Sequence, residues 1–303
     1  MKHTLSVVIS AYNEEKKLET CLSSVVNFAD EILVIDNTSS DKTVKIAESF
    51  KAKVFIKENN LMLNINKNYG FEKAGGDWIL NLDADEEVTG ELKNEIQTIL
   101  KSDMTQAKKG YWIPRKNIIF GKWIQYGLWW PDKQMRLFQR GSGKFQCRHI
   151  HEYIQIEGEM GDLTNPYIHY NYDSISQYLQ KLERCTTSEA LALKESQYQL
   201  SWFDALRFPL SDFIKIFFAQ NGYRDGLHGL VLSLFQGFYS FIVFTKLWEM
   251  EQFSQKSVTL PTMLEELKKQ KHELSYWITS VKIRESRNIF YTILLKIKRR
   301  LSL

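Results

Sequence analysis

The feature that most constrains the fold is the alternation of short β-branched runs with helical patterns between residues 5 and 100. This rhythm is typical of an α/β domain in which helices cover a mostly parallel sheet. It predicts strands at residues 5–10, 31–35, 53–56 and 78–82. A helix is expected after each strand, the first capped by Asn13 and the others at residues 42–50, 64–74 and 89–100.

The second half of the chain has a different pattern. Residues 111–120 and 133–138 are predicted to form further strands, and the pattern is helical from Ser174 onward. We therefore expect three regions, which are an α/β region at residues 1–170, a helical region at residues 171–250 and amphipathic basic helices at residues 251–303.

Two segments of the second half suggest contact with a membrane. Residues 226–245 contain no Asp, Glu, Lys or Arg, and a stretch of this length is able to span a bilayer. His228, Gln236 and three glycines weaken that interpretation, and a helical hairpin lying in the interface or packed on the protein has the same composition. Residues 282–300 carry seven basic residues and one acid, which suits an interfacial helix or one docked on the protein, with a stripe of Ile289, Ile293 and Ile297.

Composition argues against several classes of protein. The 303 residues are 44% hydrophobic and 25% charged, so neither extended disorder nor a multi-span membrane protein is indicated. A dispersed net charge of +4 argues against a nucleic-acid partner. The three cysteines, Cys21, Cys147 and Cys185, lie far apart and suit a reducing compartment. Because the first apolar run is too short for a signal peptide, we expect a cytoplasmic protein.

Acidic and aromatic residues gather where the predicted strands end. Tyr12, Asp36 and Asp83 each follow a strand, and open α/β sheets bind ligands outside the carboxyl ends of their strands. If the segment is extended, Asp83 and Asp85 point to the same side and are able to hold Mg²⁺ or Mn²⁺ against phosphate oxygens. The alternative is that these carboxylates only cap the following helix.

Several motifs resemble those of one enzyme family. The segments VVISAYNEE, ILVIDNTSSDKT and NKNYGFEKAGGDWILNLDADEE occur in the order and spacing of family 2 glycosyltransferases of the GT-A fold. The segments YGLWWPDKQMRLFQRGSGKF and PYIHYNY resemble the subgroup that includes the lipopolysaccharide inner-core heptose β-1,4-glucosyltransferases. The resemblance implies an α/β, GT-A nucleotide-diphospho-sugar transferase domain with a Rossmann-like, mixed and mostly parallel sheet, followed by a helical C-terminal region.

The resemblance also implies which residues bind the nucleoside of a donor. Tyr12, Glu14 and Asp36 would contact the uracil and ribose of a UDP-sugar. Lys67 would face the base or the diphosphate. Taken alone, Asp36 is equally able to cap the next helix, and Lys67 to be a solvated helix residue.

The diphosphate and the metal would lie beside the acidic cluster. The resemblance implies that Asp85 binds the Mg²⁺ or Mn²⁺ ion and that Asp83 beside it touches the metal, the ribose or the sugar. Arg136 suits a forked contact with phosphate, although on a strand it is equally able to pair with acids.

An inverting transfer needs a base that takes the proton of the acceptor hydroxyl. In the family this acid follows a strand that resembles residues 135–138, and His151 and Glu152 occupy that place. Glu152 is the candidate base, with His151 orienting it. Asp132 is the alternative base, and packing in a loop is the other interpretation of His151.

The predicted function is inverting transfer of a hexose, with glucose expected, from a UDP-sugar. The acceptor would be a lipid-linked saccharide, such as the lipopolysaccharide core or another cell-envelope saccharide, reached from the cytoplasm by a protein peripherally associated with the inner membrane. An S- or O-glycosyltransferase acting on a peptide or another envelope glycan would share every donor-site residue. The alternative of another class is an inactive nucleotide-sugar-binding protein or membrane scaffold.

Overall fold

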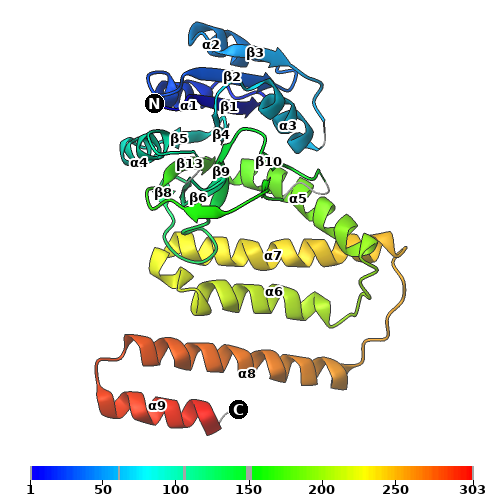
Figure 1. Ribbon diagram of the computed structural model, residues 1–303. Helices are drawn as coiled ribbons and strands as arrows, with labels where there is room; N and C mark the ends of the chain where they lie inside the picture. Colours follow the sequence, from blue (N-terminus) through cyan, green and yellow to red (C-terminus); the bar gives the residue numbers. More distant parts are fainter. Residues whose placement is uncertain (1, 61, 105–106, 148–151, 302–303) are drawn as a thin grey trace. The chain divides into compact units, whose positions relative to one another are not determined.

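The computed structural model describes residues 2–60, 62–104, 107–147 and 152–301 (Figure 1). The chain divides into two compact units, one formed by residues 1–123 and 129–173 and the other by residues 124–128 and 174–303. The boundary expected at residue 170 lies close to the division at residue 173. A further division at residue 250 remains a prediction.

The first unit is built on a mixed sheet that, within the described residues, has seven strands in the order β12-β6-β9-β4-β1-β2-β3. Four neighbouring pairs are parallel, while β9 runs antiparallel to both β4 and β6. The mixed, mostly parallel sheet is therefore confirmed. Its strands are β1 (Leu5–Ala11), β2 (Glu31–Asp36), β3 (Lys53–Ile56), β4 (Trp78–Asp83), β6 (Gly110–Ile113), β9 (Gln134–Gln139) and β12 (Met160–Asp162).

Helices cover both faces of this sheet, which explains why its central strands are almost continuously apolar. In β1, Val7 and Ile9 pack on the face covered by α1, α2 and α4, whereas Val8 packs on the face covered by α3. Helix α3 approaches closely, because a β-carbon at Gly70 would lie 2.5 Å from Cγ1 of Val8. The helices are α1 (Leu18–Val25), α2 (Thr43–Ser49), α3 (Leu63–Lys73) and α4 (Gly90–Leu100).

A second sheet, in the order β5-β13-β7-β8, lies next to the chain that leaves β4. Strand β13 pairs antiparallel with β5 and parallel with β7. A two-stranded sheet of β10 and β11 completes the described strands of this unit. These strands are β5 (Glu86–Val88), β7 (Arg115–Ile119), β8 (Lys122–Trp123), β10 (Gly143–Lys144), β11 (Gln155–Ile156) and β13 (Tyr167–Tyr172).

Two local predictions are wrong. Asn13 does not cap α1, which begins at Leu18, because its side chain instead accepts the backbone N–H of Ser40 at 2.8 Å and fixes the loop after β2. The segment after Asp83 is not extended, since Ala84 and Asp85 form a turn from β4 into β5. The buried Glu86 stabilises this turn by accepting the N–H of Asp83 at 2.9 Å.

The second unit is helical in its described residues beyond the loop at 124–128. Helix α7 packs against α5 and α6, and Lys246 of α7 lies 3.0 Å from the Glu183 carboxylate of α5. Among the described residues, α7 is the one helix long and apolar enough to cross a membrane, and a buried core helix meets the same criterion. The helices are α5 (Ile175–Glu195), α6 (Asp204–Ile214), α7 (Leu227–Met250), α8 (Leu260–Glu285) and α9 (Ile289–Leu301).

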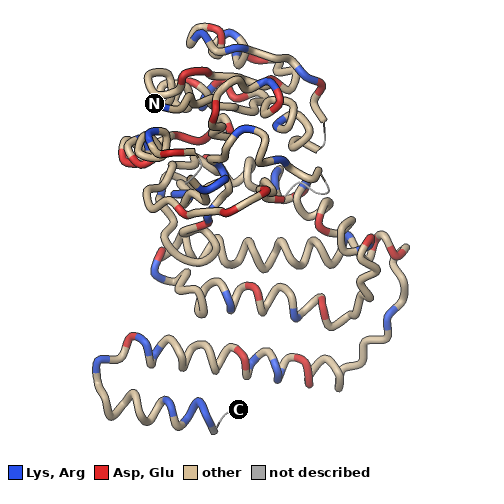
Figure 2. Tube along the Cα trace, in the orientation of Figure 1, with Lys and Arg blue, Asp and Glu red and all other residues tan. Residues whose placement is uncertain are grey.

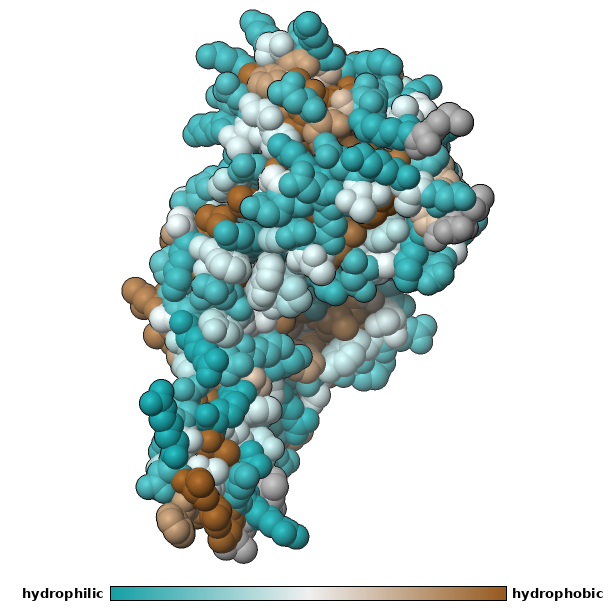
Figure 3. All heavy atoms as spheres, turned by 60° about the vertical axis from the view of Figure 1, so that its left-hand side comes forward, coloured by the Kyte–Doolittle hydropathy of each residue, from teal (hydrophilic) through white to brown (hydrophobic). Residues whose placement is uncertain are grey.

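Helix α9 leaves its apolar stripe in solvent. It docks on α8 through Leu295, which is buried, and through Arg299, which donates to Ser280 at 3.0 Å. Figure 2 shows basic residues toward the C-terminal end of α9, and Figure 3 shows apolar atoms exposed at the lower end of that view. The exposed apolar residues are Ile289, Phe290, Ile293, Leu294 and Ile297.

Candidate active site

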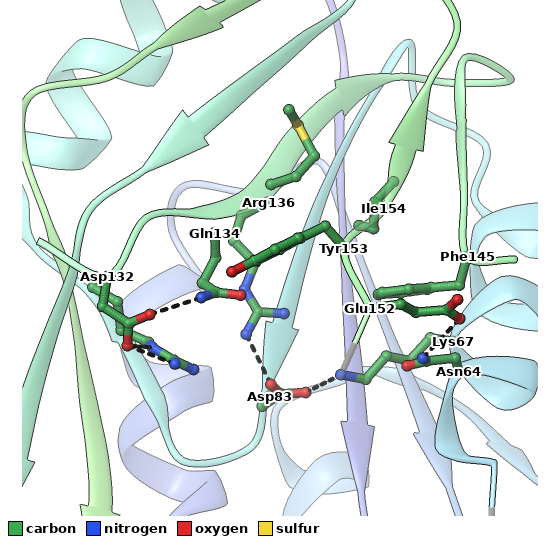
Figure 4. Close-up of a pocket in the computed structure, with 12 residues that line it drawn as sticks. Asn64, Lys67, Asp83, Asp132, Gln134, Arg136, Phe145, Glu152, Tyr153 and Ile154 are labelled. Carbon is green, nitrogen blue, oxygen red and sulfur yellow. Dashed lines mark hydrogen bonds and ion pairs between the residues drawn. The ribbon is translucent and has the colours of Figure 1, made fainter. Parts of the chain in front are cut away.

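The carboxyl ends of β1, β2 and β4 meet at one edge of the sheet. The strand register pairs Ser10 with Asp83 and Ala11 with Asp36. A pocket of about 280 Å³ opens beside the end of β4 (Figure 4). It brings together five residues that the sequence predicted, namely Lys67, Asp83, Asp132, Arg136 and Glu152. Tyr12, Glu14, Asp36 and Asp85 do not line it.

Asp83 forms ion pairs with two basic side chains. Its Oδ1 lies 2.5 Å from Nζ of Lys67, and its Oδ2 accepts from Arg136 at 2.8 Å. Burial alone would raise the pKa of this carboxyl group, but the charges of Lys67 and Arg136 outweigh burial and hold the pKa of Asp83 well below its usual range. Each oxygen accepts one of these hydrogen bonds, and the role of Asp83 beside a metal remains a prediction.

Arg136 lies beneath the pocket floor with only 5% of its surface exposed. Besides Asp83, it donates to the buried Glu86 at 2.5 Å and to the hydroxyl of Tyr167 at 3.3 Å. Burial alone would lower the pKa of Arg136, but Glu86, Tyr167 and Asp83 together outweigh burial and raise the pKa well above its usual value. Pairing with acids, the alternative to a phosphate contact, is what the structure contains.

Asp85 faces a histidine that the sequence analysis did not single out. Nε2 of His169, on β13, lies 3.4 Å from Oδ2 of Asp85. The backbone carbonyl of Asp85 also accepts the N–H of Tyr170 at 2.9 Å, which fixes the turn against β13. Asp85 and His169 thus present one carboxylate and one imidazole nitrogen to the same place.

The pKa of Glu14 reflects the negative charge around the turn between β4 and β5. The pKa of Glu14 is raised to about 7, first by burial and then by the charge of Asp85, with Asp83 adding to the effect and Lys17 opposing it. A cation at Asp85 would relieve this repulsion. No cluster of three or more His, Cys, Asp or Glu side chains able to hold a metal occurs in the described residues. An ion held by one carboxylate and one imidazole nitrogen would take its remaining ligands from water and phosphate, as Mg²⁺ commonly does.

The nucleoside-side residues flank the ends of β1 and β2. Asp36 is buried, and its Oδ2 accepts the N–H of Ser39 at 2.9 Å. Its Oδ1 has no hydrogen-bond partner among the described residues, although a buried carboxylate oxygen normally has one. Tyr12 is 45% exposed at the same edge. Asp36 therefore offers an acceptor to a ligand N–H or O–H. The N–H of Thr43, at the start of α2, donates to Asp41 and not to Asp36.

Glu152 is positioned by α3. Its Oε1 accepts from Nδ2 of Asn64 at 3.0 Å and from the backbone N–H of Cys147 at 2.6 Å. One turn further along the helix, Asn68 bonds both the carbonyl and the N–H of Phe145, each at 2.9 Å. The carboxylate consequently lines the pocket in a defined place. His151 lies outside the described residues.

Asp132 is engaged on all sides. Its Oδ2 accepts from Nε and Nη2 of Arg115 at 2.8 and 2.6 Å and from Asn117 at 2.8 Å, and its Oδ1 accepts from Gln134 at 3.0 Å. A carboxylate has about four lone-pair positions for donors. Asp132 therefore has little capacity left for an acceptor hydroxyl, which favours Glu152 as the base.

Comparisons with known proteins agree with this architecture. The family described as glycosyl transferase family 2 matches residues 6–152. An uncharacterized glycosyltransferase of Rickettsia conorii is 30% identical over 264 residues, covering 82% of this chain and 93% of the relative. The chain belongs to glycosyltransferase family 2.

Other relatives of this family 2 glycosyltransferase are more distant. The lipopolysaccharide core biosynthesis glycosyltransferase LpsC of Rhizobium meliloti is 25% identical, and the match covers 82% of this chain and 93% of LpsC. The crystal structure of S. aureus TarS 1-349 in complex with UDP-GlcNAc is 12% identical, covers 85% of this chain and 95% of that one, and superposes with a TM-score of 0.42. The catalytic unit of this family 2 enzyme has the GT-A fold.

Sequence reasoning missed three residues of this glycosyltransferase site. Asn64 holds the candidate base, and its position three residues before Lys67 on one helix face was the available signal. His169 stands in the segment PYIHYNY, and its Nδ1 lies 2.7 Å from Oδ1 of Asn117. No local pattern links either residue to Asp85, because their proximity depends on the pairing of β13 with both β5 and β7.

Proposed function

We propose that this family 2 enzyme is an inverting, metal-dependent hexosyltransferase that uses a UDP-sugar, with UDP-glucose as the donor. The observation that supports this most directly is the pocket beside β4, where the Glu152 carboxylate and the ion-paired Asp83 share one cavity with Lys67. A carboxylate group suits an acceptor hydroxyl, and a cationic side chain suits a nucleotide diphosphate.

The donor would be held at the edge of the sheet. The open acceptor of Asp36 suits an N–H of the uracil or a ribose hydroxyl, and the exposed ring of Tyr12 suits stacking on the base. Asp85 and His169 would hold Mg²⁺ or Mn²⁺. When bound, the ion supplies positive charge that stabilises the departing diphosphate.

Glu152 would act as the base. Its carboxylate takes the proton of the acceptor hydroxyl while that oxygen attacks the anomeric carbon and UDP departs from the opposite face of the sugar. Asn64 and the backbone N–H of Cys147 keep the carboxylate oriented during the transfer.

The proposed acceptor is a lipid-linked saccharide of the lipopolysaccharide core type. The relative LpsC, which is matched over 93% of its length, is a glycosyltransferase of lipopolysaccharide core biosynthesis. A peptide acceptor would use the same donor site, so only direct assays with both acceptors separate the two.

A panel of nucleotide sugars tests the donor. With Mn²⁺ present, we expect UDP-glucose to be hydrolysed slowly and to raise the melting temperature by several degrees, since a ligand at about 100 times its Kd stabilises by about 2.7 kcal/mol. GDP-mannose is the matched control and should do neither. Equal stabilisation by GDP-mannose and UDP-glucose would contradict the uridine assignment. Transfer to a cysteine peptide in place of a core oligosaccharide would contradict the acceptor.

We further propose that α9 holds the enzyme on the inner membrane surface. The exposed stripe of Phe290, Ile293 and Ile297 lies on a helix whose last turn carries Lys298, Arg299 and Arg300. Such a helix suits the interface of an anionic bilayer, because its apolar face enters the acyl boundary while its basic residues meet the headgroups.

Vesicle flotation tests this surface. We expect the protein to float with phosphatidylglycerol-containing vesicles, and the triple variant Phe290→Ser, Ile293→Ser, Ile297→Ser to bind at least about tenfold more weakly, since each buried apolar side chain contributes about 1.5–3 kcal/mol. Ile56→Ser, at an equally exposed isoleucine of the first unit, is the matched control. Flotation of the triple variant at the parent's level would refute the anchor.

A further inference from the structure

Asn117 connects the two acids that the sequence singled out on either side of the site. It lies on β7, is fully buried, and contacts Asp132 on one side and His169 on the other. His169 in turn faces Asp85. A chain of side-chain contacts therefore runs from Asp132 through the buried Asn117 and His169 to Asp85.

The orientation of the Asn117 amide follows from its partners. Its Nδ2 donates to the carbonyl oxygen of Trp129 at 2.9 Å and to the carboxylate of Asp132 at 2.8 Å. Both partners are acceptors only, the second because Arg115 holds it as a carboxylate. The reversed amide would place its oxygen against both of them. The Oδ1 of Asn117 must consequently face His169.

This orientation decides which imidazole nitrogen carries the proton. Oδ1 of Asn117 lies 2.7 Å from Nδ1 of His169 and only accepts, so Nδ1 must be the donor. In the neutral imidazole, Nε2 then carries the lone pair, and it is directed toward Asp85 at 3.4 Å. Two electron-rich groups facing one another make a pair of metal ligands, and metal-bound histidines commonly donate their other N–H to a fixed acceptor.

We propose that Asn117 is a positioning residue that locks His169 in the Nδ1–H tautomer and so presents Nε2 with Asp85 to the cation. Asp132, which the sequence suggested as an alternative base, anchors this amide and acts through it. The inference rests on the proposed metal dependence for its catalytic consequence, but the tautomer itself is a property of the metal-free protein.

The first measurement is made without metal. In protein labelled with ¹⁵N at its six histidines, long-range ¹H–¹⁵N correlations distinguish the two tautomers, and the signals lost in His169→Gln assign that ring. We expect the Nδ1–H tautomer in the parent. We expect a mixture of tautomers in Asn117→Leu, which has a similar size and no acceptor. An Nε2–H tautomer in the parent would overturn the inference.

The second measurement is Mn²⁺ affinity in the presence of UDP, read from the electron paramagnetic resonance of free Mn²⁺. We expect Asn117→Leu to bind Mn²⁺ about 10–100-fold more weakly, as for other residues that orient metal ligands. If Asn117→Leu does not fold, the parent still decides the tautomer. Unchanged affinity in a folded Asn117→Leu, with weaker binding in His169→Gln, would overturn the positioning role. A parent that binds no Mn²⁺ but holds the Nδ1–H tautomer would instead refute the metal dependence of the proposed function.

Discussion

Asp85→Ala is expected to lower the transfer rate by about a thousandfold, which corresponds to about 4 kcal/mol of transition-state stabilisation. Asp85 is the carboxylate that faces Nε2 of His169, whereas Asp83 is already paired with Lys67 and Arg136. Removing Asp85 leaves a lone imidazole for the cation. The measurement is kcat for UDP release in saturating Mn²⁺, and Asp162→Ala, at a surface aspartate of β12, is the matched control.

The loss should not come from unfolding. The charge of Asp85 helps to raise the pKa of Glu14 to about 7, after the larger effect of burial. A carboxyl group with a raised folded-state pKa binds protons more tightly in the folded than in the unfolded protein. Its contribution to stability is therefore lost as the pH rises from about 4.5 to about 7. Metal-free Asp85→Ala should accordingly melt no lower than the parent above pH 7. Turnover close to the parent's in Mn²⁺ would contradict the assignment.

The sequence predicted the parts of the fold that depend on local pattern. Strand β3 lies at the predicted residues 53–56, and α3 is displaced by one residue, because β-branched and aromatic runs and glycine-marked ends carry strong local signals. Asn13 misled the prediction because its amide, well suited to a helix cap, bonds a loop that is distant in sequence.

The sequence predicted which residues form the site, because their types and local motifs are visible in it, but it did not predict their partners. Lys67, Asp83, Arg136 and Glu152 do converge on one pocket. The sequence did not predict their roles. Arg136 meets Asp83 only because β9 pairs antiparallel with β4, and the two residues are more than fifty positions apart. His169 reaches Asp85 from another sheet. Which acids are paired with arginine or lysine is therefore a property of the strand order.

Glu152→Gln is expected to reduce transfer by about 10²–10⁴-fold while leaving UDP-sugar binding intact, which is the usual contribution of a positioned base. Glutamine keeps one side-chain oxygen, so it is able to accept from Cys147 N–H and Asn64 as Glu152 does, and the pocket wall should stay in place. What it lacks is the basic oxygen that takes the acceptor proton.

The matched comparison is Asp132→Asn, which removes the other candidate base and changes the side-chain shape as little as Glu152→Gln does. Because Asp132 already accepts four hydrogen bonds, we expect this variant to lose thermal stability and some Mn²⁺ affinity but to keep transfer well above that of Glu152→Gln. Both variants are assayed for kcat and for binding of the UDP-sugar. The reverse order of rates, with Glu152→Gln near the parent and Asp132→Asn inactive, would move the base to Asp132. It would also require the pairing with Arg115 to open before each transfer.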